Sequence, residues 1–263
     1  VLFRSTDPRH PDNDRFVLSK GHAAPVLYAA WAEAGIIRRE DTLTLRRLDS
    51  DLEGHPTPRL PWIDVATGSL GQGICAAIGI ALNARRIASA YRTYVLIGDG
   101  ESAEGSVWEA AAVGAREGLD NLCAITDVNG LGQSGESIWG HDVEAYASRW
   151  RGFGWHAVVV DGHDLEALIE AFAEARRTTG RPTMLVARTV KGKGIALAEG
   201  KAGWHGKAFK KGAEMDGVIA GLEAQLVPGA GGAPAPQPPP RVNRPAPVAA
   251  SVGTPGYALG DSV

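Results

Sequence analysis

The chain has 263 residues, of which 44% are apolar, and it carries a formal net charge of −3. That length can bury a sizeable core, and the near-neutral charge gives no bulk attraction to nucleic acid or to a membrane surface, so neither is expected as a partner. No run approaches the roughly 18 apolar residues of a membrane span, and residues 1–15 lack the charge pattern and apolar run of a signal peptide. We therefore expect a soluble, cytoplasmic protein.

Strand and helix patterns alternate through the central part of the chain. Apolar runs of strand length occupy residues 94–97, 122–126, 157–160 and 184–187. Helical patterns follow Gly71 and cover residues 104–116. A third helix is predicted to bury a stripe at i, i+3, i+4 and i+7, formed by Leu165, Leu168, Ile169 and Phe172. Continuous apolar runs separated by helices predict an α/β fold, a doubly wound, mostly parallel sheet with helices on both faces.

Cys75 and Cys123 both stand inside apolar stretches of sequence. A thiol in such surroundings behaves as a small hydrophobe, and free thiols are typical of a reducing compartment, where disulfides are rare. We therefore interpret both as buried packing residues and expect neither a disulfide nor a metal site from them.

Both ends of the chain differ in composition from its centre. Residues 227–252 are rich in Pro, Ala and Gly and cannot bury a core, which predicts an interdomain linker. We expect residues 6–226 to form one domain and residues 253–263 to begin a second, so that the chain is a piece of a longer protein. The opening VLFRS matches one reading frame of a common sequencing-adapter end, and we expect residues 1–5 to be an assembly artefact.

An acidic turn directly follows the apolar run at 94–97. Residues 98–101 read GDGE, so Asp99 stands between two glycines at the expected carboxyl end of a parallel strand, where loops line the ligand crevice. Glycines there let the backbone approach a phosphate, and a carboxylate can bind a hard cation. Taken alone, the tripeptide GDG is more often an ordinary Asp-Gly turn.

A second polar turn follows the next predicted strand. Residues 127–130 read DVNG, so neighbouring parallel strands would bring Asp99 and Asn129 to the same edge of the sheet. Their oxygen atoms suit Mg²⁺, which takes few protein ligands and completes its octahedron with water and phosphate oxygens. The pair therefore predicts a metal-bridged diphosphate site.

The spacing from GDG at 98–100 to Asn129 is that of the thiamine diphosphate motif, and the surrounding sequence resembles transketolase, most closely its animal-like branch. The segments that carry the resemblance are FVLSKGHAAPVLYAAWAEAG (16–35), DLEGHPTP (51–58), ATGSLGQG (66–73), GDGESAEGSVWEA (98–110), DVNGLGQS (127–134), FGWHAVVVDGHD (153–164), VKGKGIA (190–196) and WHGK (204–207). They agree in order and spacing over nearly all of residues 14–210. The resemblance implies the diphosphate-binding domain of the thiamine diphosphate fold.

The resemblance also implies a set of ligands for the cofactor and its metal. It places Mg²⁺, for which Ca²⁺ or Mn²⁺ could substitute, on Asp99, the Asn129 side chain and the Leu131 carbonyl. The residues that it places on thiamine diphosphate are His22, Gly68, Ser69, Leu70, Gly100, Asn129, Gln133, Lys191 and His205. Among these, the ammonium of Lys191 would supply positive charge beside the diphosphate.

Three of the seven histidines match active-site histidines of the family. They are His22 in SKGHA, His55 in EGHP and His205 in WHGK, and an imidazole that titrates near neutrality suits substrate contact and proton transfer. The remaining histidines have no assigned role: His10, His141, His156 and His163. Glu104 matches a glutamate that links the two cofactor sites of the dimer, and it is equally well explained as an acid at a helix start.

Transketolases move a two-carbon ketol unit from a ketose phosphate to an aldose phosphate in the pentose phosphate pathway. The resemblance implies this activity, sugar phosphate substrates, and a homodimer whose active site is shared with the pyrimidine-binding domain of the other subunit. Cofactor activation in the family needs a glutamate of that second domain, which these 263 residues do not hold. We therefore expect the chain alone to be inactive.

Two alternatives stay open. The chain could belong to another thiamine diphosphate enzyme, of the deoxyxylulose phosphate synthase or dihydroxyacetone synthase type, although WHGK and GHPTP favour transketolase. It could instead be a non-catalytic transketolase-like subunit, whose signature would be loss of metal ligands or active-site histidines, and these are all present. The preferred sugars are undetermined, as is whether the second domain lies on the same chain or on a separate subunit.

Overall fold

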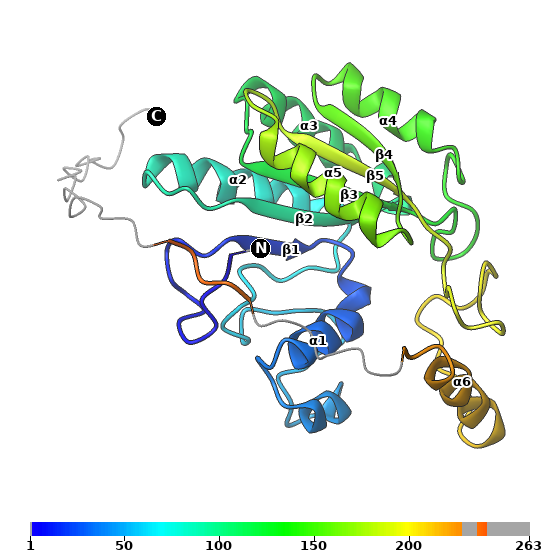
Figure 1. Cartoon of the computed structure of the whole chain (residues 1–263). Helices are drawn as coiled ribbons and strands as arrows, with labels where there is room; N and C mark the ends of the chain where they lie inside the picture. Colours follow the sequence, from blue (N-terminus) through cyan, green and yellow to red (C-terminus); the bar gives the residue numbers. More distant parts are fainter. Residues whose placement is uncertain (1, 228–235, 241–263) are drawn as a thin grey trace, which may run out of the picture.

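The computed structural model describes residues 2–227 and 236–240 and contains one five-stranded sheet (Figure 1). The strands are β1 (Arg15–Leu18), β2 (Thr93–Gly98), β3 (Leu122–Val128), β4 (His156–Asp161) and β5 (Thr183–Arg188). All neighbouring pairs are parallel, in the order β1-β2-β3-β5-β4. The sheet confirms the predicted α/β fold, because its strands are joined through helices that return the chain to the same edge.

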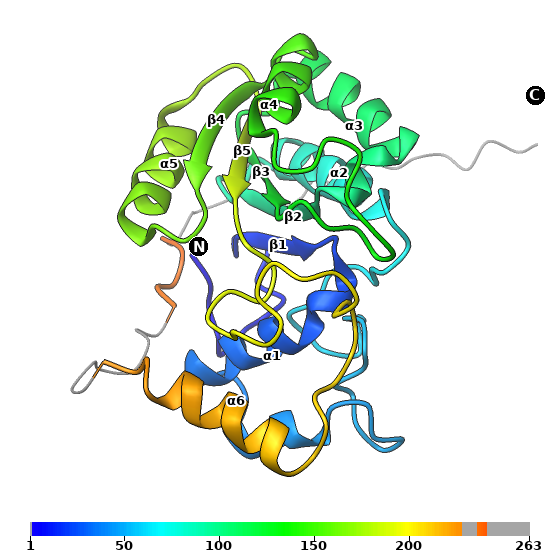
Figure 2. The same ribbon diagram turned by 90° about the vertical axis from the view of Figure 1, so that its right-hand side faces the viewer.

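Helices cover both faces of the sheet. The helices of the described residues are α1 (Ala24–Glu33), α2 (Gln72–Arg86), α3 (Gly105–Arg116), α4 (Val143–Gly152), α5 (Leu165–Arg177) and α6 (Ala213–Glu223), with short 3-10 turns at Gly21–Ala23, Arg39–Thr44 and Gly100–Ala103. The view in Figure 2 separates α5 on one face from α2, α3 and α4 on the other. Within the described residues, none of these helices has the length and hydropathy needed to cross a membrane.

The main core lies between the sheet and the layer formed by α2, α3 and α4. The rings of Trp150 and Trp155 pack in a tilted arrangement at a centroid distance of 4.9 Å and are fully buried there, together with Ile74 of α2 and Val95 of β2. A second, smaller core joins the opposite face of the sheet to α5. Burial on both faces explains why the strands read as continuous apolar runs, since most residues on either face of β2 and β3 are buried.

The buried stripe predicted for α5 is wrong at two of its four positions. Leu165 is 74% exposed and Ile169 is 70% exposed, whereas the other two positions pack partly against the sheet. The residues that α5 buries are Ala171 and Ala175. Small side chains let the helix approach the strands closely, so the alanines form the fully buried part of the contact face, and Leu168 and Phe172 pack beside them.

The two thiols differ in their surroundings, and both are free. Cys123 on β3 is buried as predicted, and burial raises its pKa to about 12. Cys75 is exposed, so the prediction that it is buried is wrong. The apolar residues around it in sequence belong to another face of α2, where Ile74 and Ile78 enter the core.

Strand β1 has no counterpart among the predicted elements. It is four residues long and lies at the edge of the sheet beside β2, with Leu18 opposite Leu96. A run this short gives little periodicity to read. Its consequence is large, because the segment that follows, from Ser19 to His22, starts at the same edge of the sheet as the turns after β2 and β3.

The predicted domain boundaries fall largely beyond these elements. Most of the proposed linker (227–252) and all of the proposed second domain (253–263) lie outside the described residues. Within residues 1–5, Phe3 is 5% exposed and its ring packs 5.1 Å from that of Trp31. The division of the chain into domains and the origin of residues 1–5 stay predictions.

The alanines of α5 generate a stability prediction. Replacing Ala171 with Leu adds volume where the helix contacts the sheet, so we expect the free energy of unfolding to fall by about 1–3 kcal/mol. The matched control, Ile169→Ala, removes volume from an exposed site and should change it by less than about 0.5 kcal/mol. Urea denaturation followed by circular dichroism measures both, and equal losses would contradict the assigned contact face.

Candidate active site

The carboxyl ends of all five strands open into one cleft of about 1220 Å³. Segments that follow each strand line it, and those after β1, β2, β3 and β5 bring Lys20, Asp99, Asn129 and Lys191 to a common edge of the sheet. Pockets for small ligands commonly have volumes of roughly 300–1000 Å³, so this one has room for more than a small metabolite. Its position agrees with the rule that open α/β sheets bind ligands at the carboxyl ends of their strands.

Asp99 is a buried carboxylate at the end of β2, only 2% exposed. Its Oδ1 accepts a hydrogen bond from Gly100 N at 2.7 Å, and its Oδ2 accepts from Gly130 N at 2.7 Å and from Ser137 Oγ at 3.0 Å. Burial raises the pKa of Asp99 above its usual value, against the effect of these hydrogen bonds. No lysine or arginine of the described residues forms an ion pair with it, so the buried charge calls for a cation.

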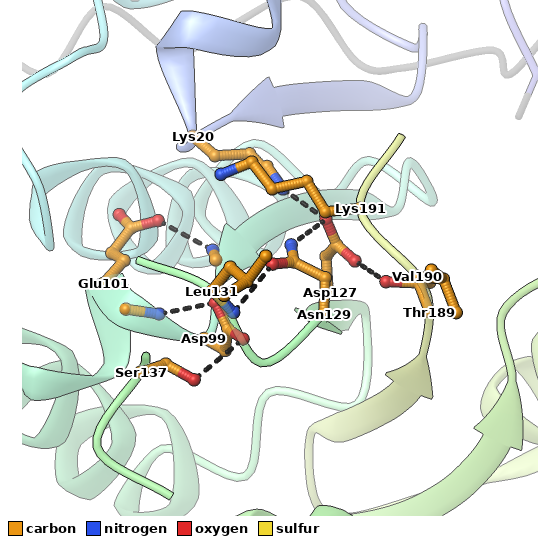
Figure 3. A network of polar contacts seen from close by, with 12 residues as sticks. Lys20, Asp99, Glu101, Asp127, Asn129, Leu131, Ser137, Thr189, Val190 and Lys191 are labelled. Carbon is orange, nitrogen blue, oxygen red and sulfur yellow. Dashed lines mark hydrogen bonds and ion pairs between the residues drawn. The ribbon is translucent and has the colours of Figure 1, made fainter. Parts of the chain in front are cut away.

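The oxygens expected to accompany Asp99 lie on the loop after β3. The pairing of Gly98 with Asp127 sets the register of β2 and β3 and brings Asp99 and Asn129 together, as predicted. Asn129 Oδ1 accepts from Leu131 N at 3.1 Å and keeps one lone pair free. Across the described chain, no donor reaches the carbonyl oxygen of Leu131. Figure 3 shows Asp99, Asn129 and Leu131 close together at the ends of these strands.

This donor set fits Mg²⁺ on chemical grounds. It offers one carboxylate, one amide oxygen and one carbonyl oxygen, each with an unused lone pair, and Mg²⁺ prefers a few such oxygens completed by phosphate and water. The described residues contain no cluster of three or more His, Cys, Asp and Glu side chains suited to a metal. A site for a softer metal such as Zn²⁺ would need ligands of that kind.

Glycines leave space in the wall of the cleft. A side chain on Gly100 would begin 3.4 Å from Cα of Gly132, and one on Gly68 would meet the ring of His55 at 2.8 Å. Gly68 also has a φ of +132°, which other residues rarely adopt. The missing side chains let backbone and imidazole approach the space where a phosphate or ring would lie.

Lys20 and Asp127 form a buried ion pair that the sequence patterns did not reveal. Lys20 Nζ contacts Asp127 Oδ2, and Thr189 Oγ donates to Asp127 Oδ1. Burial disfavours ionised Asp127, but the charge of Lys20 and its hydrogen bond outweigh burial and hold the pKa of Asp127 below its usual value. The pair joins β1 to β3 and, through Thr189, to β5. The only sequence signal for this pair was the presence of a lysine in the SKGH segment and of an aspartate in the DVN segment.

Three basic side chains, Lys191, His205 and His22, gather in the same cleft. Lys191 Nζ donates to His205 Nδ1 at 3.1 Å, and the rings of His205 and His22 lie 4.3 Å apart. Burial, followed by the charge of Lys20, lowers the pKa of His22 to about 4. Burial, with the charge of nearby lysines, also lowers the pKa values of Lys191 and His205. The cluster is a place where an anion would relieve mutual repulsion.

The structure brings together nearly all of the residues that the sequence predicts for the site. Those lining the cleft are His22, His55, Gly68, Leu70, Asp99, Gly100, Asn129, Leu131, Gln133, Lys191 and His205. Ser69 is the exception. Arg46, to which the sequence patterns gave no role in the site, lies in a turn with a φ of +61° and lines the cleft. Glu104 is exposed at the start of α3 and makes no capping hydrogen bond.

Glu101 is a further buried carboxylate in the wall of the cleft, and it contacts three segments. Its Oε1 accepts from Ser19 Oγ and from Gly71 N at 2.9 Å, and its Oε2 accepts from Gly98 N at 3.0 Å. Glu101 thus ties the ends of β1 and β2 to the start of α2. It fixes the relative positions of the loops that carry Lys20 and Asp99.

Comparisons with known proteins agree with this site. Residues 2–219 match the family model described as transketolase, thiamine diphosphate binding domain. The chain is 53% identical to transketolase-like protein 2 of Bos taurus over 227 residues, which are 86% of this chain and 36% of that protein. It is 52% identical to transketolase of Homo sapiens over 212 residues, 80% of this chain and 34% of that protein.

A solved structure with the same fold is that of transketolase from Pichia stipitis in complex with sedoheptulose-7-phosphate. It superposes with a TM-score of 0.69 at 35% sequence identity, over 75% of this chain and 31% of that one. The fold and the cleft therefore define a thiamine diphosphate-binding α/β domain. The chain belongs to the transketolase family, and it spans about a third of the length of the relatives it matches.

The contacts of Glu101 generate a prediction. In Glu101→Gln the amide NH₂ must face either Gly98 N or the donors Ser19 Oγ and Gly71 N, which leaves a buried N–H without an acceptor. We expect the free energy of unfolding to fall by about 1–3 kcal/mol. Glu117→Gln on the exposed end of α3 is the matched control, and a loss in Glu101→Gln no larger than in this control would show that the network contributes little.

The depressed pKa of His22 predicts a pH dependence of stability. An unfolded histidine titrates near 6.5 and the folded one near 4, so the folded chain binds fewer protons between these values. Stability should therefore rise with pH across this window and be lost as pH falls from about 6.5 toward 4. The difference in melting temperature between the wild type and His22→Asn, measured from pH 7 to pH 4, isolates this contribution. A ring NMR titration of His22 with a midpoint near 6.5 would contradict it.

Proposed function

We propose that this chain supplies the diphosphate- and metal-binding half of a transketolase active site, with Mg²⁺ as the metal. The whole protein would transfer a two-carbon ketol unit from a ketose phosphate to an aldose phosphate. The observation that carries the proposal is the convergence of the free oxygens of Asp99, Asn129 and Leu131 on one edge of the sheet, beside Lys20 and Lys191. Oxygens with unused lone pairs, one of them from a buried carboxylate, beside an ammonium group that no described carboxylate pairs with are the arrangement that a metal–diphosphate pair requires.

The cleft residues would divide the binding of the cofactor between them. Asp99, Asn129 and Leu131 would hold Mg²⁺, and Lys191 would face the diphosphate as a point charge, since no described carboxylate pairs with it. Gly100 leaves the backbone accessible to a phosphate. Thiamine diphosphate, when bound, supplies the electron sink that allows a carbon–carbon bond next to a carbonyl to be broken and formed.

The histidines would handle protons and orient the sugar. With a pKa of about 4, His22 is neutral near pH 7 and can both donate and accept a hydrogen bond. His205 Nδ1 accepts from Lys191, so the proton of its neutral ring lies on Nε2 and can be donated to a ligand oxygen. His55, packed on Gly68, is the third group available for substrate contact.

The substrates and assembly follow from the same proposal. The solved transketolase of Pichia stipitis is a complex with sedoheptulose-7-phosphate, and a sugar phosphate would enter the open side of this cleft. The family match supports a homodimer in which a pyrimidine-binding domain of the partner completes the site and Glu104 contacts its counterpart. We propose that the complete protein is cytoplasmic.

Metal dependence provides a direct test with this chain. We expect thiamine diphosphate to bind in the presence of Mg²⁺ and to be released by EDTA, as measured by isothermal titration calorimetry. Asp99→Asn removes the only carboxylate of the donor set, and affinity should fall about 100-fold or more, equivalent to roughly 3 kcal/mol. Asp164→Asn, which keeps the cap of α5, is the matched control because Asn caps as well as Asp.

Ketol transfer itself requires the whole protein. A coupled assay with xylulose 5-phosphate as donor and ribose 5-phosphate as acceptor should detect activity in the complete protein with thiamine diphosphate and Mg²⁺. Cofactor binding without ketol transfer would instead favour a non-catalytic transketolase-like subunit. Absence of metal-dependent cofactor binding would refute the proposal altogether.

A further inference from the structure

One peptide group in the wall of the cleft is held from both sides by histidines to which the proposed catalysis gives no role. His141 Nε2 lies 2.9 Å from the carbonyl oxygen of Thr189, and His163 Nε2 lies 2.8 Å from the backbone nitrogen of Val190. The Thr189 carbonyl and the Val190 N–H belong to the same peptide unit. Two ring nitrogens from different loops therefore form hydrogen bonds with the C=O and the N–H of a single peptide group.

The two bonds require opposite tautomers of the two rings. A carbonyl oxygen only accepts, so His141 must carry a proton on Nε2 and donate it to Thr189 O. A backbone N–H only donates, so Nε2 of His163 must be bare, and a neutral ring then has its proton on Nδ1. The backbone N–H of His163 donates to Asp161 Oδ1 at 2.9 Å and fixes the start of its loop.

This 189–190 peptide connects the end of β3, at Asp127, with Lys191 on the other side of the proposed phosphate site. On one side, Thr189 N donates to Val128 O at 2.9 Å and Thr189 Oγ donates to Asp127. On the other side the next residue is Lys191, whose ammonium contacts His205. Figure 3 shows Thr189, Val190 and Lys191 following one another beside Asp127.

His141 also touches the metal loop. Gly130, next to Asn129, has a φ of +77°, and a side chain there would meet the His141 ring at 3.0 Å. The ring therefore packs directly on the backbone beside an expected metal ligand. The same ring then bridges the loop after β3 and the segment after β5, which hold the metal oxygens and Lys191 respectively.

We propose that His141 and His163 are positioning residues that clamp the 189–190 peptide and so hold Lys191 in place before the cofactor arrives. A loose segment must be ordered when the ligand binds, and that cost reduces affinity. The effect of the clamp on cofactor affinity rests on the proposed function, whereas the clamp itself does not.

The tautomers can be measured on the unaltered chain. Two-bond ¹H–¹⁵N correlation spectra of ¹⁵N-histidine-labelled protein near pH 8 distinguish Nε2–H from Nδ1–H. We expect His141 as the Nε2–H form and His163 as the Nδ1–H form, assigned by the loss of each signal in His141→Gln and His163→Gln. An Nε2–H form at His163, or an Nδ1–H form at His141, overturns the clamp.

Exchange and binding of variants test what the clamp does. His163→Ala removes the acceptor, so the Val190 amide should exchange with deuterium faster, and the Kd for thiamine diphosphate with Mg²⁺ should rise about five-fold, the contribution of one neutral hydrogen bond. His163→Gln offers a carbonyl oxygen near the same place and should restore both. His156→Ala, on β4 and paired with Glu174 away from the cleft, is the matched control.

A double substitution shows whether the effect passes through Lys191. In a Lys191→Met background, His163→Ala should cause little further loss of affinity, because the group being positioned is gone. Equal losses in both backgrounds would refute the positioning role. If the wild type does not bind thiamine diphosphate at all, the proposed function fails, and the tautomers and the Val190 exchange still decide whether the clamp exists.

Discussion

The hydrogen-bonded pairing of β2 with β3 places Gly98 opposite Asp127, and the geometry of the site follows from this register. Because both strands run in the same direction, the turns that follow them emerge at one edge, where Asp99 accepts a hydrogen bond from Gly130 N. A shift of one residue would turn the side chains to the other face and separate these groups. The oxygens that we propose to bind a metal are therefore held by two neighbouring, largely buried strands of the sheet.

The cleft contains one negative and one positive group whose charges no described side chain neutralises. Lys20 and Asp127 neutralise one another, but Asp99 is buried with no cation and Lys191 has no carboxylate among the described residues. A divalent cation with a diphosphate supplies both missing charges at once. Such a site is costly to keep empty, since burial opposes ionised Asp99 and lowers the pKa of Lys191.

Hydrogen bonds from residues around the cleft hold these charged groups in position. Glu101 ties the loops after β1 and β2 to the start of α2, and the pair His141 and His163 grips the peptide that precedes Lys191. None of these three side chains needs to contact a ligand to affect binding. Each one hydrogen-bonds to the backbone that carries the ligand-contacting groups and so fixes the orientation of those groups. The site is thus continuous with the hydrogen bonding of the sheet edge.

The sequence by itself determined the parallel α/β fold and the polar turns at Asp99 and Asn129, because continuous apolar runs and short polar motifs are local patterns. Its short motifs also singled out three histidines that line the cleft, His22, His55 and His205. It did not reveal β1, whose four residues are too few to show a period, or the face of α5, where Ala171 and Ala175 displace Leu165 and Ile169 from the contact. The sequence also did not reveal which groups form hydrogen bonds or ion pairs with Lys20, Glu101, His141 and His163. Lys20 and Asp127 are 107 positions apart, and only the packing of strands and helices decides which distant polar groups meet.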